Sequence, residues 1–182
     1  MTAEGNDTTD EEQGGEADAI AAGMAAFTDR IDYPLFVLTI GVPDDEPSGC
    51  LAGFVTQCSI VPPRFLVCVS KVNHTFFASE RSDGLALHLL GEEQTALASL
   101  FGEESGDSVS KFDHCAWSPG ATGAPLLDDC AAWLECRVLD RFDVGDHRAL
   151  LVRPLSGGPG NQPGVFTYRN APDFDAGHPA TA

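Results

Sequence analysis

The sequence predicts a mainly β domain in which about six strands close into a barrel, with a few short helices inserted between them. The first observation is the length, since 182 residues suit one domain with its own core. The second is the composition, 43% hydrophobic and 21% charged, which is ordinary for a globular protein. The third is a series of short apolar runs separated by Gly, Pro and Asn, which is typical of strands joined by turns.

The first 16 residues differ from the rest of the chain. They are rich in Gly, Thr and acidic residues and contain almost no apolar ones, so they predict a disordered acidic tail. The Ala-rich stretch at residues 17–27 then predicts a short helix. We therefore expect the folded domain over residues 17–170, followed by a C-terminal tail over residues 171–182.

Three strands are expected in the first half of the domain. Residues 33–40 form an apolar run that predicts a buried strand. Further strands are expected at residues 51–59 and 65–70. The paired Pro62 and Pro63 separate the last two, because proline has no N–H to donate to a sheet.

A helix, a strand and a second helix are expected next. Asn73 is a good N-cap for a short helix through Glu80, and Gly84 is placed to end it. Residues 85–90 are apolar with one polar interruption, which predicts a strand. Residues 94–101 show the spacing of an amphipathic helix.

The last part of the domain predicts a hairpin. Residues 133–139 alternate apolar and polar, residues 144–146 predict a turn, and residues 149–152 predict the returning strand. Residues 157–160 (GGPG) are expected in a loop. Residues 165–169 are expected to form the last strand.

The charge and the cysteines restrict the compartment and the partners. Asp and Glu number 28 against 10 Lys and Arg, so a net charge of -18 opposes binding to nucleic acid or anionic lipid. The sequence shows neither a basic signal-peptide start nor an apolar run near the ~20 residues of a spanning helix. The six cysteines have irregular spacing without a C-x-x-C pair, so we expect reduced thiols and no metal site. We expect a cytoplasmic protein without nucleic-acid or membrane partners.

Short motifs follow one another in a specific order between residues 30 and 155. They are GCLA at 49–52, TQCSIVPP at 56–63, VCVSK at 67–71, NHT at 73–75, KF at 111–112, Trp117, GAPLL at 123–127, WLEC at 133–136 and GDH at 145–147. In this order they resemble the flavin reductase-like, FMN-binding split-barrel family. The resemblance implies an antiparallel split β-barrel of Greek-key type. It also implies a homodimer that binds FMN or FAD near the subunit interface and uses NAD(P)H as co-substrate.

A phosphate site is predicted where the strand at residues 65–70 leads into the helix capped by Asn73. The free N–H groups and the positive dipole end of a helix start favour an anion. From the residues alone, Asn73 as a plain cap and Lys71 as a solvated charge remain open. The resemblance implies that phosphate contacts lie on this segment. The candidates are Ser70, Lys71, Asn73, His74 and Thr75.

The flavin ring needs backbone donors and an apolar bed, which a strand edge can supply. The resemblance implies that this edge consists of Thr56, Gln57, Cys58 and Ser59. The sequence departs from the family at five positions, and the family usually has small hydroxyl residues where Gly53, Phe54 and Gln57 stand. The departures are Gly53, Phe54, Gln57, Val72 and His74. We expect them to alter flavin affinity or the choice of flavin.

His147 is the candidate catalytic residue. From the residues alone, a histidine beside a hairpin turn is more often an ordinary surface group. The resemblance places it on the nicotinamide side of the flavin, where it would orient the nicotinamide or balance charge during hydride transfer. We do not assign it as a general acid.

Three functional hypotheses follow. The first is an NAD(P)H:flavin oxidoreductase, including one that supplies reduced flavin to a partner monooxygenase. The second is a flavin-binding protein without turnover. The third is a split barrel that binds haem or deazaflavin instead, or that serves only as an interaction domain.

Overall fold

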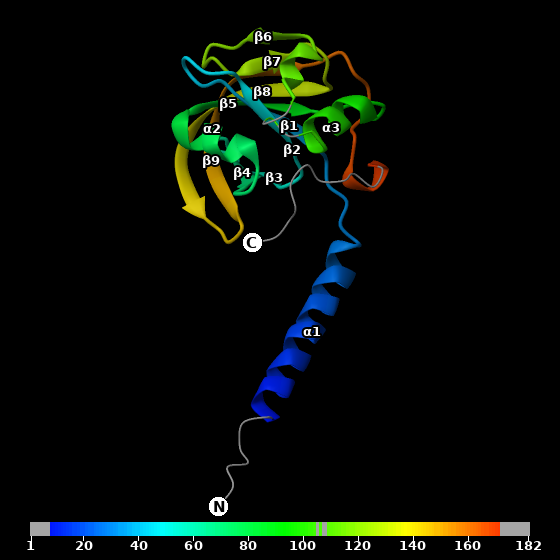
Figure 1. The fold of residues 1–182 in the computed structure, drawn as a ribbon. Helices are drawn as coiled ribbons and strands as arrows, with labels where there is room; N and C mark the ends of the chain where they lie inside the picture. The colour runs from blue at the N-terminus through cyan, green and yellow to red at the C-terminus, as the bar shows by residue number, and fades with distance from the viewer. Residues whose placement is uncertain (1–7, 105, 107–108, 172–182) are drawn as a thin grey trace, which may run out of the picture. The chain divides into compact units, whose positions relative to one another are not determined.

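The computed structural model describes residues 8–104, 106 and 109–171 (Figure 1). The chain divides into two compact units, Met1–Asp32 and Tyr33–Ala182. The first unit contains helix α1, Thr8–Thr28. Residues 8–16, which were expected in a disordered tail, therefore belong to this helix. The rest of the predicted N-terminal tail, and all but Ala171 of the C-terminal one, lie outside the described residues.

The second unit is built on a seven-stranded antiparallel sheet in the order β2-β1-β5-β8-β9-β4-β3. Its strands are β1 Phe36–Ile40, β2 Ser48–Ala52, β3 Val55–Ser59, β4 Arg64–Ser70, β5 Gly84–Leu89, β8 Ala132–Asp143 and β9 His147–Pro159. A separate pair is formed by β6 Trp117–Pro119 and β7 Pro125–Leu127. None of the helices in the described part of the chain is long and apolar enough to cross a membrane.

The sheet is closed by a two-residue link. Strands β2 and β3 stand at opposite ends of the strand order, yet only Gly53 and Phe54 separate them in the chain. A flat sheet would keep its two edge strands far apart, so the sheet has to curl round on itself. The N–H of Cys68 on β4 donates to the carbonyl of Phe54 at 2.9 Å, which fixes the link. The prediction of an antiparallel barrel with a few short helices is confirmed.

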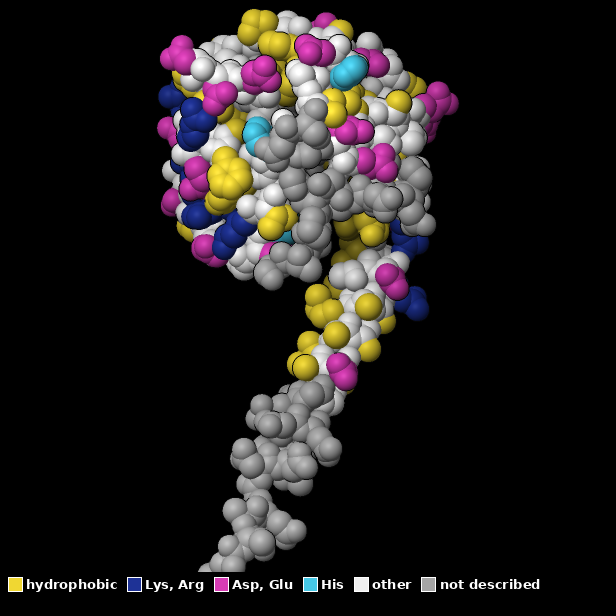
Figure 2. Space-filling model, in the orientation of Figure 1, with side chains coloured by type: hydrophobic (Ala, Val, Ile, Leu, Met, Phe, Trp, Pro, Cys, Tyr) yellow, Lys and Arg dark blue, Asp and Glu magenta, His cyan; other side chains and the backbone are white. Residues whose placement is uncertain are grey.

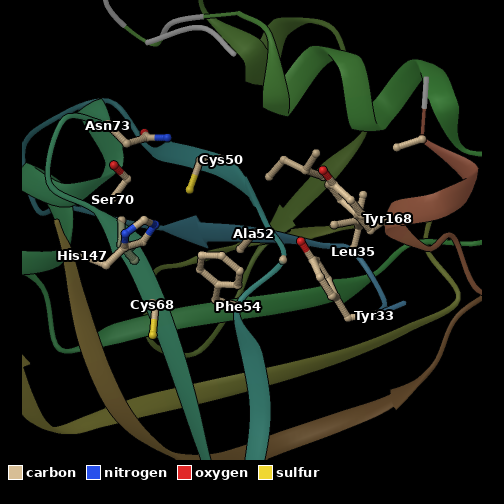
Figure 3. A pocket seen from close by; sticks show the side chains of 14 residues that line it. Tyr33, Leu35, Cys50, Ala52, Phe54, Cys68, Ser70, Asn73, His147 and Tyr168 are labelled. Carbon is tan, nitrogen blue, oxygen red and sulfur yellow. The ribbon is translucent and has the colours of Figure 1, made fainter. Parts of the chain in front are cut away.

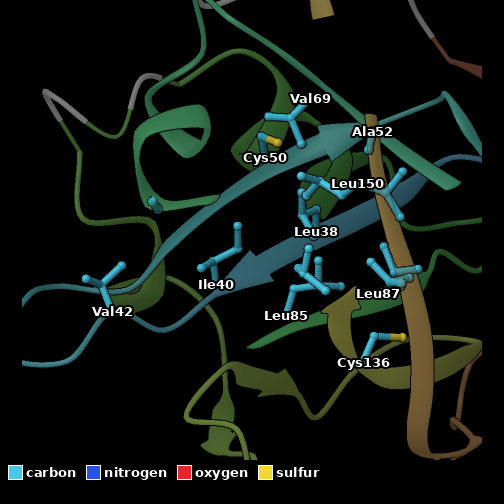
Figure 4. Close-up of a cluster of buried hydrophobic side chains, with 14 residues drawn as sticks. Leu38, Ile40, Val42, Cys50, Ala52, Val69, Leu85, Leu87, Cys136 and Leu150 are labelled. Carbon is cyan, nitrogen blue, oxygen red and sulfur yellow. The ribbon is translucent and has the colours of Figure 1, made fainter. Parts of the chain in front are cut away.

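The interior of the barrel is filled with aliphatic side chains. Figure 4 shows Leu38, Leu85, Leu87 and Leu150 gathered from β1, β5 and β9, and each is at most 2% exposed. The residues that alternate with them on β1 and β5, among them Val37 and Ala86, are also buried, so both faces of these two strands are covered. Burying each side chain stabilises the fold by roughly 1.5–3 kcal/mol.

Two short helices lie against the sheet region. They are α2, His74–Arg81, and α3, Thr95–Gly102. The predicted cap is confirmed, because the Oδ1 atom of Asn73 accepts from the N–H of Thr75 at 3.0 Å. The predicted end of α2 at Gly84 is wrong, since Gly84 begins β5. A Cβ atom at this position would lie 2.5 Å from Thr122, so close packing is what requires glycine.

One predicted strand and one predicted loop differ from the structure. The predicted strand at residues 51–59 is two strands, because the chain turns sharply at Gly53, whose carbonyl accepts from the N–H of Val55. The predicted loop at 157–160 is largely strand, because β9 continues to Pro159 with Gly157 packed closely on Leu134.

The predicted last strand at residues 165–169 is absent. Thr167 makes only an isolated bridge to Pro34, and residues Tyr168–Asn170 form a 3-10 turn. The β6–β7 pair was not predicted, since strands of three residues are too short to show alternation.

The acidic residue of the WLEC motif fixes the turn between β6 and β7. Glu135 is 3% exposed, and its carboxylate accepts from the N–H of Thr122 at 2.6 Å and from the hydroxyl of Ser156 at 3.1 Å. Burial opposes the charged form, but these hydrogen bonds outweigh it and lower the pKa of Glu135. The buried carboxylate therefore stabilises the turn as an acceptor.

His88 is a second buried polar group that connects layers of the fold. Its Nε2 accepts from the N–H of Leu127 at 3.0 Å, so its Nδ1 carries the proton donated to the carbonyl of Val37 at 3.1 Å. The side chain is 0% exposed, and burial lowers its pKa to about 4. The imidazole is therefore neutral and structural at pH 7.

The titration of His88 predicts an acid-sensitive stability. Its pKa is about 6.5 in an unfolded chain and lower in the fold, so the unfolded state takes up the proton first as pH falls. The contribution is fully present above pH 6.5, and about 3 kcal/mol of unfolding free energy is lost by pH 4. Over this pH range, the free energy of unfolding measured with urea should depend less steeply on pH in His88→Gln than in wild type. The exposed His114→Gln is the control, and equal slopes in all three proteins would contradict the prediction.

Candidate active site

A cavity of about 450 Å³ opens between β2, the start of α2 and the first residue of β9 (Figure 3). Its size lies within the range of pockets that bind cofactors and other small molecules. One end is polar and the other is aromatic. The strip from Cys50 to Phe54 lines the cavity between the two ends.

The polar end is brought together by strand register. Ser70, the last residue of β4, is the cross-strand partner of His147, the first residue of β9. Asn73 stands three residues after Ser70 and caps α2. Figure 3 shows the amide nitrogen of Asn73 directed towards the cavity. This donor and the positive end of the helix dipole suit an anionic group.

The aromatic end is formed by residues distant in sequence. The rings of Tyr33 and Tyr168 stack with their centroids 5.0 Å apart at an interplanar angle of 22°. Leu35 adds an aliphatic surface beside them. This end provides an apolar bed for a flat ring system.

His147 is held by its neighbour. Its Nδ1 atom lies 2.8 Å from Oδ1 of Asp146, and its side chain is 23% exposed. The hydrogen bond from the imidazole lowers the pKa of Asp146, which keeps this carboxyl ionised. The contact fixes the ring orientation and leaves Nε2 as the remaining polar atom of the ring.

Lys71 lies outside the lining of the cavity. Its ammonium group bonds both carboxylate oxygens of Asp143, at 2.9 and 2.8 Å, and also the carbonyl of Gly145. The hydrogen bond from Lys71 lowers the pKa of Asp143. These contacts fix the β8–β9 turn beside the site. A contact between Lys71 and the phosphate stays a prediction.

His74 and Thr75 also lie outside the cavity lining. The hydroxyl of Ser48 contacts Nδ1 of His74 at 3.2 Å and the hydroxyl of Thr75 at 3.0 Å. Thr75 is fully buried, and its backbone N–H is already bonded to Asn73. These two side chains join α2 to β2.

The predicted ring-binding edge lies outside the cavity lining as well. Strand β3 is mostly exposed, and the side chain of Gln57 bonds the carbonyl of Ser59. The reason is the turn at Gly53 and Phe54, after which Thr56, Gln57, Cys58 and Ser59 lead away from the pocket. The cavity thus gathers Ser70, Asn73 and His147 of the predicted residues.

The sequence reasoning missed the aromatic end. Tyr33 and Tyr168 are the two tyrosines of the chain, but no local pattern links residues so far apart. Phe54 was noted only as a departure from the family pattern. Among the described residues, no group of three or more metal-ligating side chains is found.

Comparison with known proteins identifies the family. The family model described as a flavin reductase like domain matches residues 28–171. The chain belongs to this family. The resemblance inferred from the order of the motifs is therefore confirmed.

Named relatives and solved structures agree with this assignment. FMN reductase (NADH) RutF of Bradyrhizobium diazoefficiens is 32% identical over 64% of this chain and 67% of that protein. The reductase subunit HsaB of a flavin-dependent monooxygenase of Mycobacterium tuberculosis is 31% identical over 58% of this chain and 55% of that protein. The structure of NADH:FAD oxidoreductase SgcE6 from Streptomyces globisporus, with NAD and FAD fragments, matches at 27% identity with a TM-score of 0.68, covering 95% and 100% of the chains. The chain spans about one third to two thirds of the length of the first curated relatives.

Asn73 allows helix capping and anion binding to be tested separately. Asn73→Asp keeps a good cap, so the free energy of unfolding should change by less than about 0.5 kcal/mol. It replaces a donor with a negative charge, so the affinity for FMN should fall about tenfold to a hundredfold. Fluorescence titration with FMN measures this. Asn73→Ala, which loses the cap, should cost about 1 kcal/mol of stability. An unchanged FMN affinity in Asn73→Asp would show that the anion binds elsewhere.

Proposed function

We propose that this protein is an NAD(P)H:flavin oxidoreductase that reduces FMN or FAD by hydride transfer. The observation that carries the proposal is the polarity of the cavity, which has a polar helix start capped by Asn73 at one end and stacked aromatic rings at the other. A flavin has the same two-part character, a flat apolar ring and a phosphate at the end of a polar chain. Bound there, the flavin supplies the hydride acceptor.

Different residues of the cavity would hold the two ends of such a cofactor. Asn73 and Ser70 would bind the phosphate end, while Tyr33 and Tyr168 would support the ring end. The backbone between Cys50 and Phe54 offers N–H and carbonyl groups along the cavity. The protein carries a net charge of -18, and Figure 2 shows acidic side chains spread over the visible face of the domain. These local neutral donors therefore have to outweigh an unfavourable overall field.

His147 would act on the nicotinamide side. Its imidazole lines the cavity, and Asp146 holds it in one orientation. From that position it would hydrogen-bond the nicotinamide amide and place the donor carbon over the flavin ring, which is catalysis by positioning. The sequence has no nucleotide-binding fingerprint, so NAD(P)H would dock from solvent and leave after each turnover.

The alternative without turnover rests on the departures from the family pattern. The structure places Gln57, Val72 and His74 outside the lining of the cavity, so these three changes do not alter its surface directly. Gly53 and Phe54 remain as departures inside the site. The relatives named as FMN reductase and as NADH:FAD oxidoreductase also favour turnover.

Steady-state oxidation of NADH and NADPH with added FMN or FAD tests the proposal. The rate should scale with both protein and flavin. His147→Ala should lower kcat/KM for the nicotinamide substrate about tenfold, with unchanged FMN affinity, because one positioning hydrogen bond is lost. Asp146→Asn should have a smaller effect in the same direction. If wild-type protein binds FMN but oxidises neither nicotinamide, the protein is a flavin carrier and the proposal is wrong.

We also propose that the protein supplies reduced flavin to a partner monooxygenase in the cytoplasm. The relative HsaB, whose name describes the reductase subunit of a flavin-dependent monooxygenase, supports such a partner. All six cysteines are unpaired, and Cys50, Cys130 and Cys136 are buried, as suits a reducing compartment. A product that leaves an open cavity can be taken up by a second enzyme.

The homodimer is a further part of the proposal. Ile60 and Val61, at the turn between β3 and β4, are 80% and 89% exposed. Strand β3 pairs only with β4 among the described strands, so its outer edge is open. Exposed apolar side chains beside an open strand edge are typical of a protein interface.

Ile60 provides the test of the dimer. Ile60→Asp should weaken self-association by at least tenfold, because it places a charge in an apolar contact. Analytical ultracentrifugation over a concentration series measures the change, and Ile60→Leu should retain the dimer. A wild-type protein that sediments as a monomer at every concentration would refute the dimer, and equal self-association of Ile60→Asp and wild type would place the contact elsewhere.

A further inference from the structure

Phe54 occupies a position that fold stability does not explain. Its backbone is fixed, because its carbonyl accepts from Cys68 and the neighbouring Gly53 closes a tight turn to Val55. Its side chain, however, is 56% exposed and lines the cavity. An exposed phenylalanine contributes little to the core, so its ring is available for a ligand.

The ring of Phe54 joins the two halves of the site. Its centroid lies 6.1 Å from that of Tyr33 and 5.4 Å from that of His147. Together with the Tyr33–Tyr168 stack, these contacts form a continuous row of rings along the cavity (Figure 3). Phe54 is the member of this row that connects the aromatic end to the candidate catalytic residue.

The angles between the rings show which of them already has a parallel partner. Tyr33 already has Tyr168 stacked nearly parallel to it, at 22°, and it packs where Gly53 lacks a side chain. Phe54, in contrast, meets Tyr33 at 51° and His147 at 58°. No parallel ring of a described residue covers a face of Phe54, and offset stacking on a flat ligand is the arrangement that aromatic rings prefer.

We propose that Phe54 is a positioning residue whose ring stacks on the flavin isoalloxazine and holds it next to His147. This inference rests on the proposed function, because it assumes a flavin in the cavity. It also explains why a large aromatic residue is placed in the link that closes the barrel. A rigid backbone beneath a stacking ring fixes the height of the flavin ring relative to β2.

Binding of the flavin ring can be tested separately from binding of the phosphate. Riboflavin has the same ring as FMN but no phosphate. Phe54→Ala should therefore weaken the binding of both ligands by the same factor, about threefold to tenfold. Asn73→Asp should weaken the binding of FMN but not that of riboflavin. A merely structural role of Phe54 would give no such pattern.

A series of substitutions at Phe54 distinguishes the effect of side-chain size from the effect of an aromatic ring. Phe54→Tyr should bind both ligands like wild type, whereas Phe54→Leu should bind them nearly as weakly as Phe54→Ala, because it retains apolar area but no ring face. The visible absorption band of bound FMN should shift in wild type and Phe54→Tyr and be closer to free FMN in the other two. Phe142→Ala removes a phenylalanine that is 43% exposed on β8 and outside the cavity lining, so it is the matched control.

The outcomes are separate from those that test the proposed function. If wild type binds neither FMN nor riboflavin, the proposed function fails before Phe54 is considered. If wild type binds both and Phe54→Ala binds them more tightly, the ring occupies the place of the flavin and the stacking proposal is wrong. Equal affinities of wild type, Phe54→Leu and Phe54→Ala would also overturn it. Thermal unfolding of each variant should match wild type, which confirms that the fold is intact.

Discussion

The fold depends on one short connection. Gly53 and Phe54 join the two strands at opposite ends of the sheet order, and the hydrogen bond from Cys68 to Phe54 fixes them in place. Closure of the barrel follows from this connection, because two consecutive strands cannot remain at distant edges of an open sheet. The same connection turns β3 away from the cavity and leaves the strip from Cys50 to Phe54 as its lining. The link that closes the barrel therefore also forms part of the lining of the site.

The site is built from neutral donors in a strongly acidic protein. Lys71 and Asp143 neutralise each other at the β8–β9 turn. In the proposed function, the phosphate end of the flavin is therefore left to Asn73, Ser70 and the start of α2. Such groups recognise a phosphate by directed hydrogen bonds, which depend less on the overall field of the protein than isolated charges do. The arrangement is consistent with selective binding of one anionic ligand and poor attraction of anions in general.

Local patterns predicted much of the fold. Asn73 as a helix cap, the hairpin of β8 and β9, and the strands at β1, β4 and β5 were all expected, because each depends on neighbouring residues. The predictions were wrong where distant contacts decide the conformation. Gly84 was expected to end α2, but it is glycine because Thr122 packs against it. Gly157 was expected in a loop, but it lies in a strand because Leu134 approaches it.

The sequence by itself determined the fold class, the family and the segment that carries the helix cap, since these follow from composition, motif order and local hydrogen bonding. Only the tertiary structure decided which residues meet in the cavity. The register between β4 and β9 brought His147 beside Ser70, and the folding of both ends of the domain stacked Tyr33 on Tyr168. These pairings join residues far apart in the chain. Their geometry is set by backbone hydrogen bonds between distant segments, which no local pattern encodes.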